Sequence, residues 1–240
     1  MQRKSLAPTL AVLGGAIVLA IVLVVASRTT SEKKRPNTSN LNIVSSINEM
    51  LRGIQQQGIA LGNPQAKLTL VEFADLQCYG CSWFSENVLP ELIQNYVRKG
   101  KLRIELEGQT IIDSGSDHDS TRLLRMALAA GEQNRLWNFV EIVYANQGAE
   151  DSGYATDTYL EAIARAVPGL NVAKSLSDRR AKRFTSVTEA SGNRYDALHF
   201  IGTPSFLLGR TGEKLTEKIS KETIPSYEEF AAIINAQLRS

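Results

Sequence analysis

The stretch VEFADLQCYGC, residues 71–81, joins a strand-like run to a helix-like run and holds the only two cysteines of the 240-residue chain, Cys78 and Cys81. A helix N-terminus presents free N–H groups and the positive end of a dipole, so it stabilises a thiolate. Such sites lower a thiol pKa from about 8.5 into the range of roughly 3.5 to 7.5, and the thiolate is the form that attacks disulfides. The stretch therefore predicts a redox dithiol, with Cys78 as the exposed nucleophile and Cys81, one turn further in, as the resolving thiol.

Two other interpretations of the cysteine pair carry less weight. A structural disulfide across a loop of about four residues would remove little unfolded-state entropy, worth roughly 2 kcal/mol. A structural zinc site needs about four ligands, and the chain adds only two scattered histidines, His118 and His199. A CxxC beside a β-α-β pattern favours redox chemistry, and we expect neither a metal nor a bound cofactor.

The elements around the cysteines are predicted from periodicity and from breaker residues. A buried strand at 67–73, a helix from Ser82 that is kinked at Pro90, and a strand at 102–107 form a β-α-β unit. A mostly helical region follows, and a second strand pair and a final helix close the chain. Further expected features are a helix at 42–57, two helices within 120–147, a helix capped by Thr158 with Glu161, a helix from Asn171 bent at Gly192, strands at 205–208 and 214–219, and a helix from Ser226.

The N-terminal segment predicts a membrane anchor. Residues 6–26 carry no charge and match the roughly 20 apolar residues that cross a bilayer as a helix. This run is longer than the apolar region of about 7–15 residues in a cleavable signal peptide, which is the alternative. We therefore expect a short cytoplasmic N-terminus at 1–5, an uncleaved signal anchor at 6–26 and a flexible linker at 27–40.

The location of the rest of the chain is predicted from cysteine use and charge. Lysines and arginines flank the apolar run on both sides, so they do not by themselves place the N-terminus in the cytoplasm, but long domains translocate largely regardless of charge. A single CxxC without stray thiols fits an oxidising exterior. The net charge of +2 gives no case for nucleic-acid binding. We expect a single-pass protein of the cell membrane with its catalytic domain outside the cytoplasm.

Four elements, in this order, carry a family resemblance: Val71-Glu72-Phe73, the CYGC at 78–81, Val88-Leu89-Pro90, and the GTPSF at 202–206. They resemble the DsbA-like branch of the thioredoxin superfamily, most closely its membrane-anchored or secreted oxidoreductases. The resemblance runs from about residue 61 to the C-terminus. It implies an α/β thioredoxin-like fold over a domain at 41–240, with an inserted helical region at about 114–200.

The resemblance also implies roles for individual residues. In such proteins the carboxyl that matches Glu72 lies near the buried cysteine and assists its proton transfers, a role that a pKa raised by burial would suit. The alternative is that Glu72 points to solvent, because strand residues alternate between faces. The resemblance implies a cis peptide between Thr203 and Pro204 facing the cysteines. Tyr79, Gly80, Thr203 and Pro204 would then contact the substrate.

Three functions remain open from the sequence. The first is a membrane-tethered thiol:disulfide oxidoreductase that forms disulfides in reduced exported proteins, acts as a monomer and is reoxidised by a quinone-linked membrane partner of the DsbB or VKOR kind, as the resemblance implies. The second is a reductase or isomerase, although no dimerisation domain of the isomerase kind is evident. The third is a non-catalytic thioredoxin-fold binding module.

Overall fold

The computed structural model describes residues 41–219 and 223–239. The expected N-terminus at 1–5, the anchor at 6–26 and the linker at 27–40 lie outside these residues. None of the helices within the described ranges is long and apolar enough to cross a membrane.

The helices are α2 (Leu41–Leu51), α3 (Tyr79–Asn87), α4 (Leu89–Leu92), the π-helix η1 (Ile93–Val97), α5 (Asp119–Gly131), α6 (Leu136–Tyr144), α7 (Asp157–Arg165), α8 (Val172–Asp178), α9 (Lys182–Ala197) and α10 (Tyr227–Arg239). The strands are β1 (Gln56–Gln57), β2 (Ala60–Leu61), β3 (Leu68–Asp75), β4 (Leu102–Gln109), β5 (Ser205–Arg210) and β6 (Glu217–Ile219).

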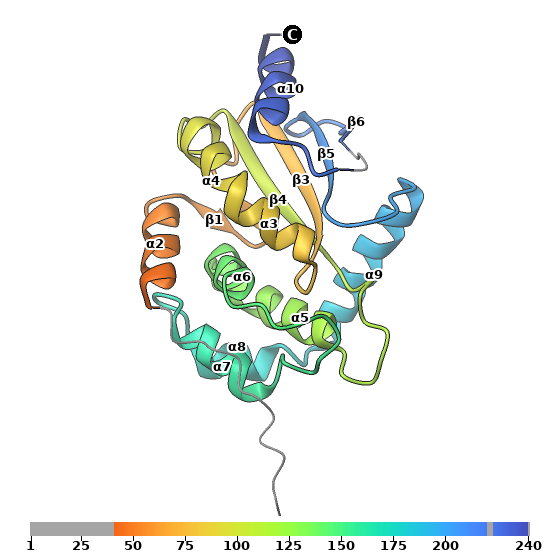
Figure 1. The fold of residues 1–240 in the computed structure, drawn as a ribbon. Helices are drawn as coiled ribbons and strands as arrows, with labels where there is room; N and C mark the ends of the chain where they lie inside the picture. The colour runs from red at the N-terminus through yellow and green to blue at the C-terminus, as the bar shows by residue number, and fades with distance from the viewer. Residues whose placement is uncertain (1–40, 220–222, 240) are drawn as a thin grey trace, which may run out of the picture. The chain divides into compact units, whose positions relative to one another are not determined.

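The strands form one mixed sheet in the order β1-β2-β4-β3-β5-β6. Strand β3 lies at its centre, parallel to β4 and antiparallel to β5. The predicted β-α-β unit is therefore present, with α3, α4 and η1 as its crossover (Figure 1). Every residue of β3 is buried, because helices cover both faces of this central strand.

The two faces of the sheet have separate aromatic clusters. On one face, Phe84 of α3 and Phe230 of α10 pack against Phe206 of β5, with ring centroids 4.7 to 5.6 Å apart. On the other face, Phe73 of β3 packs 6.1 Å from Tyr195 of α9 and 5.2 Å from Phe200. Phe73 therefore points away from α3, the helix that begins after Cys78. Because neighbouring strand residues point to opposite faces, the residues next to Phe73 in β3 point towards α3.

The crossover helix is interrupted where proline was expected to disturb it. Helix α3 ends at Asn87, and α4 begins at Leu89 with Pro90 in its first two positions. Proline has no N–H to donate, so it is tolerated at the start of a helix and not inside one. The expected kink is thus a break between two helices, and α3 is left as a short rigid element directly after Cys78.

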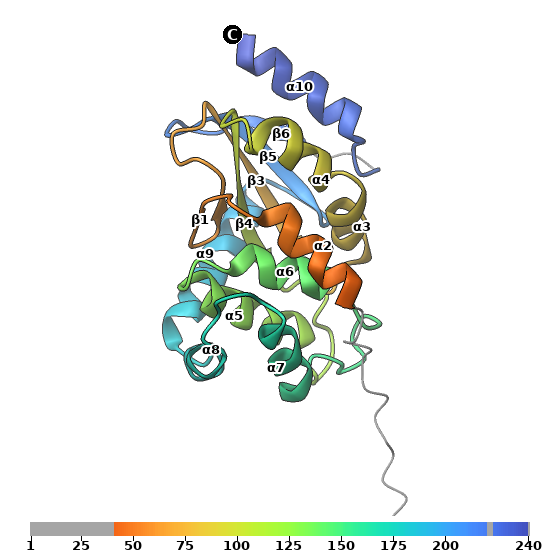
Figure 2. The same cartoon turned by 90° about the vertical axis from the view of Figure 1, so that its left-hand side faces the viewer.

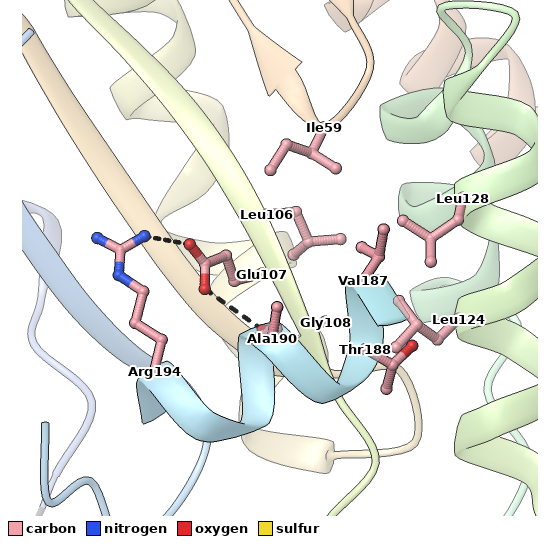
Figure 3. Close-up of a pocket in the computed structure, with 11 residues that line it drawn as sticks. Ile59, Leu106, Glu107, Gly108, Leu124, Leu128, Val187, Thr188, Ala190 and Arg194 are labelled. Atoms are coloured by element: carbon pink, nitrogen blue, oxygen red, sulfur yellow. Dashed lines mark hydrogen bonds and ion pairs between the residues drawn. The ribbon is translucent and has the colours of Figure 1, made fainter. Parts of the chain in front are cut away.

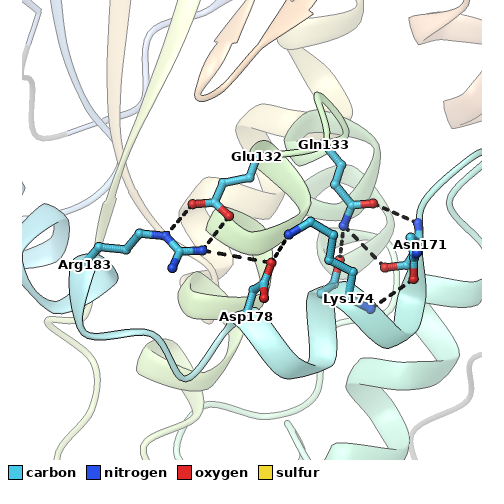
Figure 4. A network of polar contacts seen from close by, with 7 residues as sticks. Glu132, Gln133, Asn171, Lys174, Asp178 and Arg183 are labelled. Atoms are coloured by element: carbon cyan, nitrogen blue, oxygen red, sulfur yellow. Dashed lines mark hydrogen bonds and ion pairs between the residues drawn. The ribbon is translucent and has the colours of Figure 1, made fainter.

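The insertion between β4 and β5 consists of α5 to α9, and α6 joins it to the rest of the domain. Helix α6 packs against α5, α2 and α3 (Figures 1 and 2). At the far side of the insertion, Arg183 binds both carboxylate oxygens of Glu132 at 2.5 and 2.6 Å, and Gln133 donates to Ser175 Oγ at 2.8 Å (Figure 4). These contacts hold α8 and the start of α9 against the end of α5. The α/β fold with a helical insertion, as predicted, is confirmed.

Several local predictions were wrong. The first helix ends at Leu51 and not at 57, because Gln56–Gln57 pairs with β2 as a strand. Helix α7 is capped by Thr156, whose hydroxyl accepts from the Tyr159 amide at 3.2 Å, and not by Thr158. Gly192 lies inside the continuous helix α9, and the interruption falls earlier, between α8 and α9.

Trp137 provides a test of the core. It is fully buried in α6, and its indole N–H donates to the Ile59 carbonyl at 3.0 Å. Trp137→Ala is expected to lower the free energy of unfolding by about 3–5 kcal/mol, because it opens a cavity in the core. The Ile59 carbonyl keeps its second hydrogen bond, from the Leu106 N–H at 3.1 Å, so the loss comes mainly from the cavity. Denaturant unfolding followed by circular dichroism measures this loss. The matched control is Trp83→Ala, at the partly exposed second tryptophan; equal losses in the two variants would show that Trp137 does not anchor the core.

Candidate active site

Cys78 is the N-cap of helix α3, immediately after the loop that leaves the C-terminal end of β3. Its backbone N–H donates to the Asp75 carbonyl at 3.0 Å, which fixes the turn between strand and helix. The thiol of Cys78 is half-buried, whereas that of Cys81, in the first turn of the helix, is fully buried. Both are free thiols. The structure therefore has the expected asymmetry between an accessible and an enclosed sulfur at a helix start.

The surroundings of Cys78 favour its thiolate. A hydrogen bond from the Cys81 thiol makes the largest contribution and, against the opposing effect of burial, lowers the pKa of Cys78 to about 6. Smaller contributions come from Thr203 and from the backbone N–H groups of Cys81 and Gly80. The sequence predicts stabilisation of the thiolate by the helix N-terminus alone. Since Cys78 makes no side-chain capping hydrogen bond of ordinary geometry, the neighbouring thiol ranks above the helix amides.

Cys81 has the opposite character. Complete burial, followed by its interactions with Cys78, raises the pKa of Cys81 well above that of an ordinary thiol. A thiolate forms there only at a high energetic cost, so a proton has to be supplied or removed whenever Cys81 leaves or attacks. The site thus needs a proton-exchanging group next to the buried sulfur.

The loop that leads into β5 closes over the cysteines. The Thr203–Pro204 peptide is cis, as the resemblance implied, and the Cys78 thiol donates to the Thr203 carbonyl at 3.2 Å. A Cβ added to Gly80 would lie 3.3 Å from Pro204 Cδ and 3.4 Å from the Thr203 carbonyl oxygen. Four of the predicted site residues, Cys78, Gly80, Thr203 and Pro204, are therefore brought together from two distant parts of the chain.

Tyr79 is placed differently from the other predicted substrate contacts. Its side chain is 75% exposed, and its backbone N–H faces Glu150 at 3.3 Å. Ile201, next to the cis-proline loop, is more exposed still. Both residues expose apolar surface on the two segments that carry Cys78 and the cis-proline.

Glu72 is buried beneath the cysteines. It lies in β3 directly opposite Phe206 of β5, and the aromatic contacts of Phe206 place both residues on the face covered by α3. Only 2% of Glu72 is exposed. Burial, then the charges of Glu141 and Cys78, raise the pKa of Glu72 well above its ordinary value. The alternative that Glu72 points to solvent is wrong. Helices cover both faces of β3, so the alternation of strand residues between faces does not bring Glu72 to solvent.

The structure adds residues that the sequence argument missed. Gln147, just after α6, donates from its amide to the carbonyls of Leu76 at 2.9 Å and Cys78 at 3.3 Å, and so holds the loop before α3. Asp75 accepts from the Gln77 N–H at 2.9 Å and from the Ser120 hydroxyl at 2.6 Å. Glu141 is a second buried carboxyl, in α6. Its signal was present in the sequence, since a lone charge interrupts the apolar run WNFVEIVY at 137–144.

Two other features of the described chain were candidates for a site. Within residues 41–219 and 223–239, no three His, Cys, Asp or Glu side chains are arranged to hold a metal ion, and this includes His118 and His199. A hollow of about 300 Å³ between β4, α5 and α9 has an apolar lining, with the Glu107–Arg194 ion pair at one end (Figure 3). It includes none of the predicted site residues.

The contribution of Cys81 to the Cys78 pKa can be tested directly. Cys81→Ala is expected to raise the pKa of Cys78 from about 6 by about one unit or more, because it removes the largest stabilising hydrogen bond of the thiolate. The pH dependence of Cys78 alkylation measures this shift. An unchanged midpoint would mean that the helix amides and Thr203 stabilise the thiolate without the second sulfur.

Comparison with known proteins agrees with this geometry. The model of a thioredoxin family matches residues 55–236. A probable disulfide bond formation protein D of Bacillus cereus is 28% identical over 159 residues, which is 66% of this chain and 72% of that protein. A putative protein-disulfide oxidoreductase of Rickettsia bellii is also 28% identical, over 65% of this chain and 58% of that one.

Solved structures show the same fold at lower sequence identity. The crystal structure of oxidised BdbD from Bacillus subtilis matches with a TM-score of 0.64 and 17% identity, over 78% of this chain and 97% of that one. The structure of alpha-DsbA1 from Wolbachia pipientis matches with a TM-score of 0.62 and 20% identity, over 80% and 95% of the two chains. With a CxxC at a helix start, a facing cis-proline loop and these relatives, the chain belongs to the thioredoxin family, as a DsbA-like thiol:disulfide oxidoreductase.

Proposed function

We propose that the protein is a protein-disulfide oxidase that acts outside the cytoplasm and forms disulfides in exported proteins. The observation that carries the proposal is the contrast between the two sulfurs. Cys78 is half-exposed with its pKa lowered to about 6, and Cys81 is buried with its pKa raised. Relatives named as disulfide bond formation proteins support the same activity.

The reaction consists of two thiol–disulfide exchanges. A substrate thiolate attacks Cys78 Sγ in the oxidised enzyme, the Cys78–Cys81 bond breaks, and its electron pair goes to Cys81, which takes up a proton. A second substrate thiolate then attacks the substrate sulfur of the mixed disulfide and releases the Cys78 thiolate. The substrate gains one disulfide and the enzyme becomes a dithiol. A quinone-linked membrane partner of the DsbB or VKOR kind is the oxidant that restores the enzyme disulfide.

The stability of the Cys78 thiolate favours electron transfer from the substrate thiols to the enzyme disulfide. The lowered pKa of Cys78 stabilises the reduced protein fully above the unfolded-state pKa of about 8.5, and this stabilisation is lost as the pH falls through about 6. At neutral pH much of it is therefore present. A dithiol whose reduced form is stabilised is a stronger oxidant in its disulfide form.

The location is part of the proposal. The apolar segment at 6–26 would anchor the protein in the membrane, and the linker at 27–40 would let the catalytic domain, acting as a monomer, reach both its substrates and the membrane reoxidase. The exposed Tyr79 and Ile201 beside the cysteines offer apolar contact to an unfolded chain. Protease added outside intact cells or spheroplasts tests this topology, and we expect it to digest the catalytic domain.

The test of function measures disulfide transfer in both directions. The oxidised protein is expected to oxidise a reduced, unfolded protein stoichiometrically. The reduced protein, with dithiothreitol as the electron donor, is expected to reduce insulin poorly. The potential of the couple against glutathione should lie nearer about −120 mV than thioredoxin's value of about −270 mV. Efficient insulin reduction with a potential near the lower value would identify a reductase. Equal behaviour of the wild type and Cys78→Ser would identify a binding module.

A further inference from the structure

The second buried carboxyl of the site belongs to Glu141 in α6. Only 3% of this residue is exposed. Its Oε2 accepts a hydrogen bond from the Ser85 hydroxyl at 2.6 Å, and Ser85 lies in α3, four residues after Cys81. Its Oε1 has no hydrogen-bond partner within the described part of the chain, and the same holds for Oε1 of Glu72.

In the part of the chain that the structure describes, no cation pairs with these two carboxyls. None of the ion pairs among residues 41–219 and 223–239 includes Glu72 or Glu141. A buried carboxylate without a positive partner is costly, so the pair tends to retain its protons. The pKa of Glu141 is raised to about 8 by burial, against the hydrogen bond from Ser85 and with a small effect of Glu86.

Three ionisable groups from two further elements interact electrostatically with the carboxyl of Glu72. Glu141 contributes to it from α6, and Cys78 and Cys81 lie at the start of α3. Tyr144, one turn after Glu141, is also buried, and its pKa is raised by burial and by Cys81, Glu72 and Glu141. The charge on Glu141 therefore raises the pKa of Glu72, and the charge on Glu72 in turn raises the pKa of Cys81.

Within the described ranges, a hydroxyl donor that stabilises the charged form is seen at Glu141, where Ser85 donates, and not at Glu72. When the pair loses one proton, the charge settles on Glu141, and repulsion then opposes the loss of a second proton from Glu72. We infer that Glu141, held by Ser85, is a positioning residue that keeps Glu72 protonated and thus able to give its proton to Cys81. This inference rests on the proposed function.

The proton balance of the oxidative step then follows. As the Cys78–Cys81 bond breaks, the electron pair goes to Cys81 Sγ, and Glu72 transfers its proton to that sulfur. The Glu72 carboxylate formed in this step recovers a proton from water. Glu141 touches neither sulfur in this scheme, and it acts only by raising the proton affinity of Glu72.

The experiment uses the reverse direction, in which the two cysteines react in separate phases. The reduced full-length protein in detergent is mixed with the aromatic disulfide dithiobis(nitrobenzoate). In the first phase the Cys78 thiolate attacks the reagent and releases one coloured thiolate. In the second phase Cys81 gives its proton to ionised Glu72, attacks Cys78 Sγ and releases the other coloured thiolate.

Glu141→Gln is expected to lower the pH midpoint of the second phase by about one unit or more, because Glu72 then ionises without a charged neighbour. Between the two midpoints the second phase should be up to about tenfold faster than in the wild type. Ser85→Ala removes the donor that holds the charge on Glu141, so it should shift the midpoint in the same direction by a smaller amount. The first phase should keep its midpoint in both variants.

Two controls separate this effect from a structural one. In a Glu72→Gln background, Glu141→Gln should leave the second phase unchanged, because the group through which it acts is gone. Asn138→Ala changes another buried polar residue of α6, which is bonded to Asn48 and Gln56, and should move neither midpoint.

The outcomes are distinct. An unmoved midpoint in Glu141→Gln, an equal shift in the Glu72→Gln background, or an equal shift in Asn138→Ala would each overturn the inference. Should Glu141→Gln fail to fold, the Ser85→Ala shift alone decides. A wild-type protein that releases no second thiolate would instead overturn the proposed function, because its cysteines would not form a disulfide.

Discussion

Cys78→Ser is expected to reduce the oxidation of reduced, unfolded proteins to the uncatalysed rate. A hydroxyl cannot form a disulfide, and the remaining thiol, Cys81, is fully buried with a raised pKa, so it cannot replace the accessible sulfur. Recovery of substrate disulfides, followed by gel mobility after thiol blocking, measures the loss.

Cys81→Ser distinguishes the roles of the two sulfurs. This variant keeps the attacking thiol but lacks the resolving one. Mixed with a substrate that already contains a disulfide, its Cys78 thiolate attacks one substrate sulfur and the other leaves as a thiolate, so a covalent mixed disulfide between Cys78 and the substrate should accumulate. The complex should disappear on reduction. Accumulation in Cys78→Ser and not in Cys81→Ser would reverse the assigned roles.

Glu72→Gln is expected to slow the Cys81 step by about 10²-fold or more, because general acid–base groups contribute typically 10²–10⁴-fold. The substitution keeps the size and the burial of the side chain and removes the exchangeable proton. In the two-phase reaction with the aromatic disulfide, the second phase should slow while the first phase, which depends on Cys78, remains. The first phase is thus an internal control. Equal slowing of both phases would mean that Glu72 acts through the fold and not through Cys81.

Much of the fold was predictable because its strongest signals are local. The run at 67–73 is apolar and β-branched. It forms β3, whose observed end at Asp75 lies two residues beyond the predicted end. Pro90 and Gly100 mark the ends of the crossover helices for steric reasons. The two-residue strands β1 and β2 are too short for periodicity, and they exist only through long-range pairing, since β2 pairs with β4 and β1 pairs with β2. The choice of Thr156 over Thr158 as a cap likewise depends on where α7 packs.

The site was predictable where a residue type has a single strong use. Two cysteines at CxxC spacing before a helical run indicated the dithiol, and a charge inside an apolar strand indicated Glu72. The direction in which Glu72 points was not predictable, since it depends on β5 and α3 covering that face of the sheet. Glu141 lies 60 residues from Cys81 in the chain, and it reaches Ser85, one turn after Cys81, only because α6 packs against α3.

The most direct test of the central claim is a pH titration of thiolate absorbance in the reduced protein, with Cys78→Ser as the baseline. The stabilised Cys78 thiolate predicts an inflection near pH 6, present in the wild type and absent from the variant. A single inflection near pH 8.5 or above would contradict the claim, because an unperturbed thiol would give the disulfide no excess oxidising power.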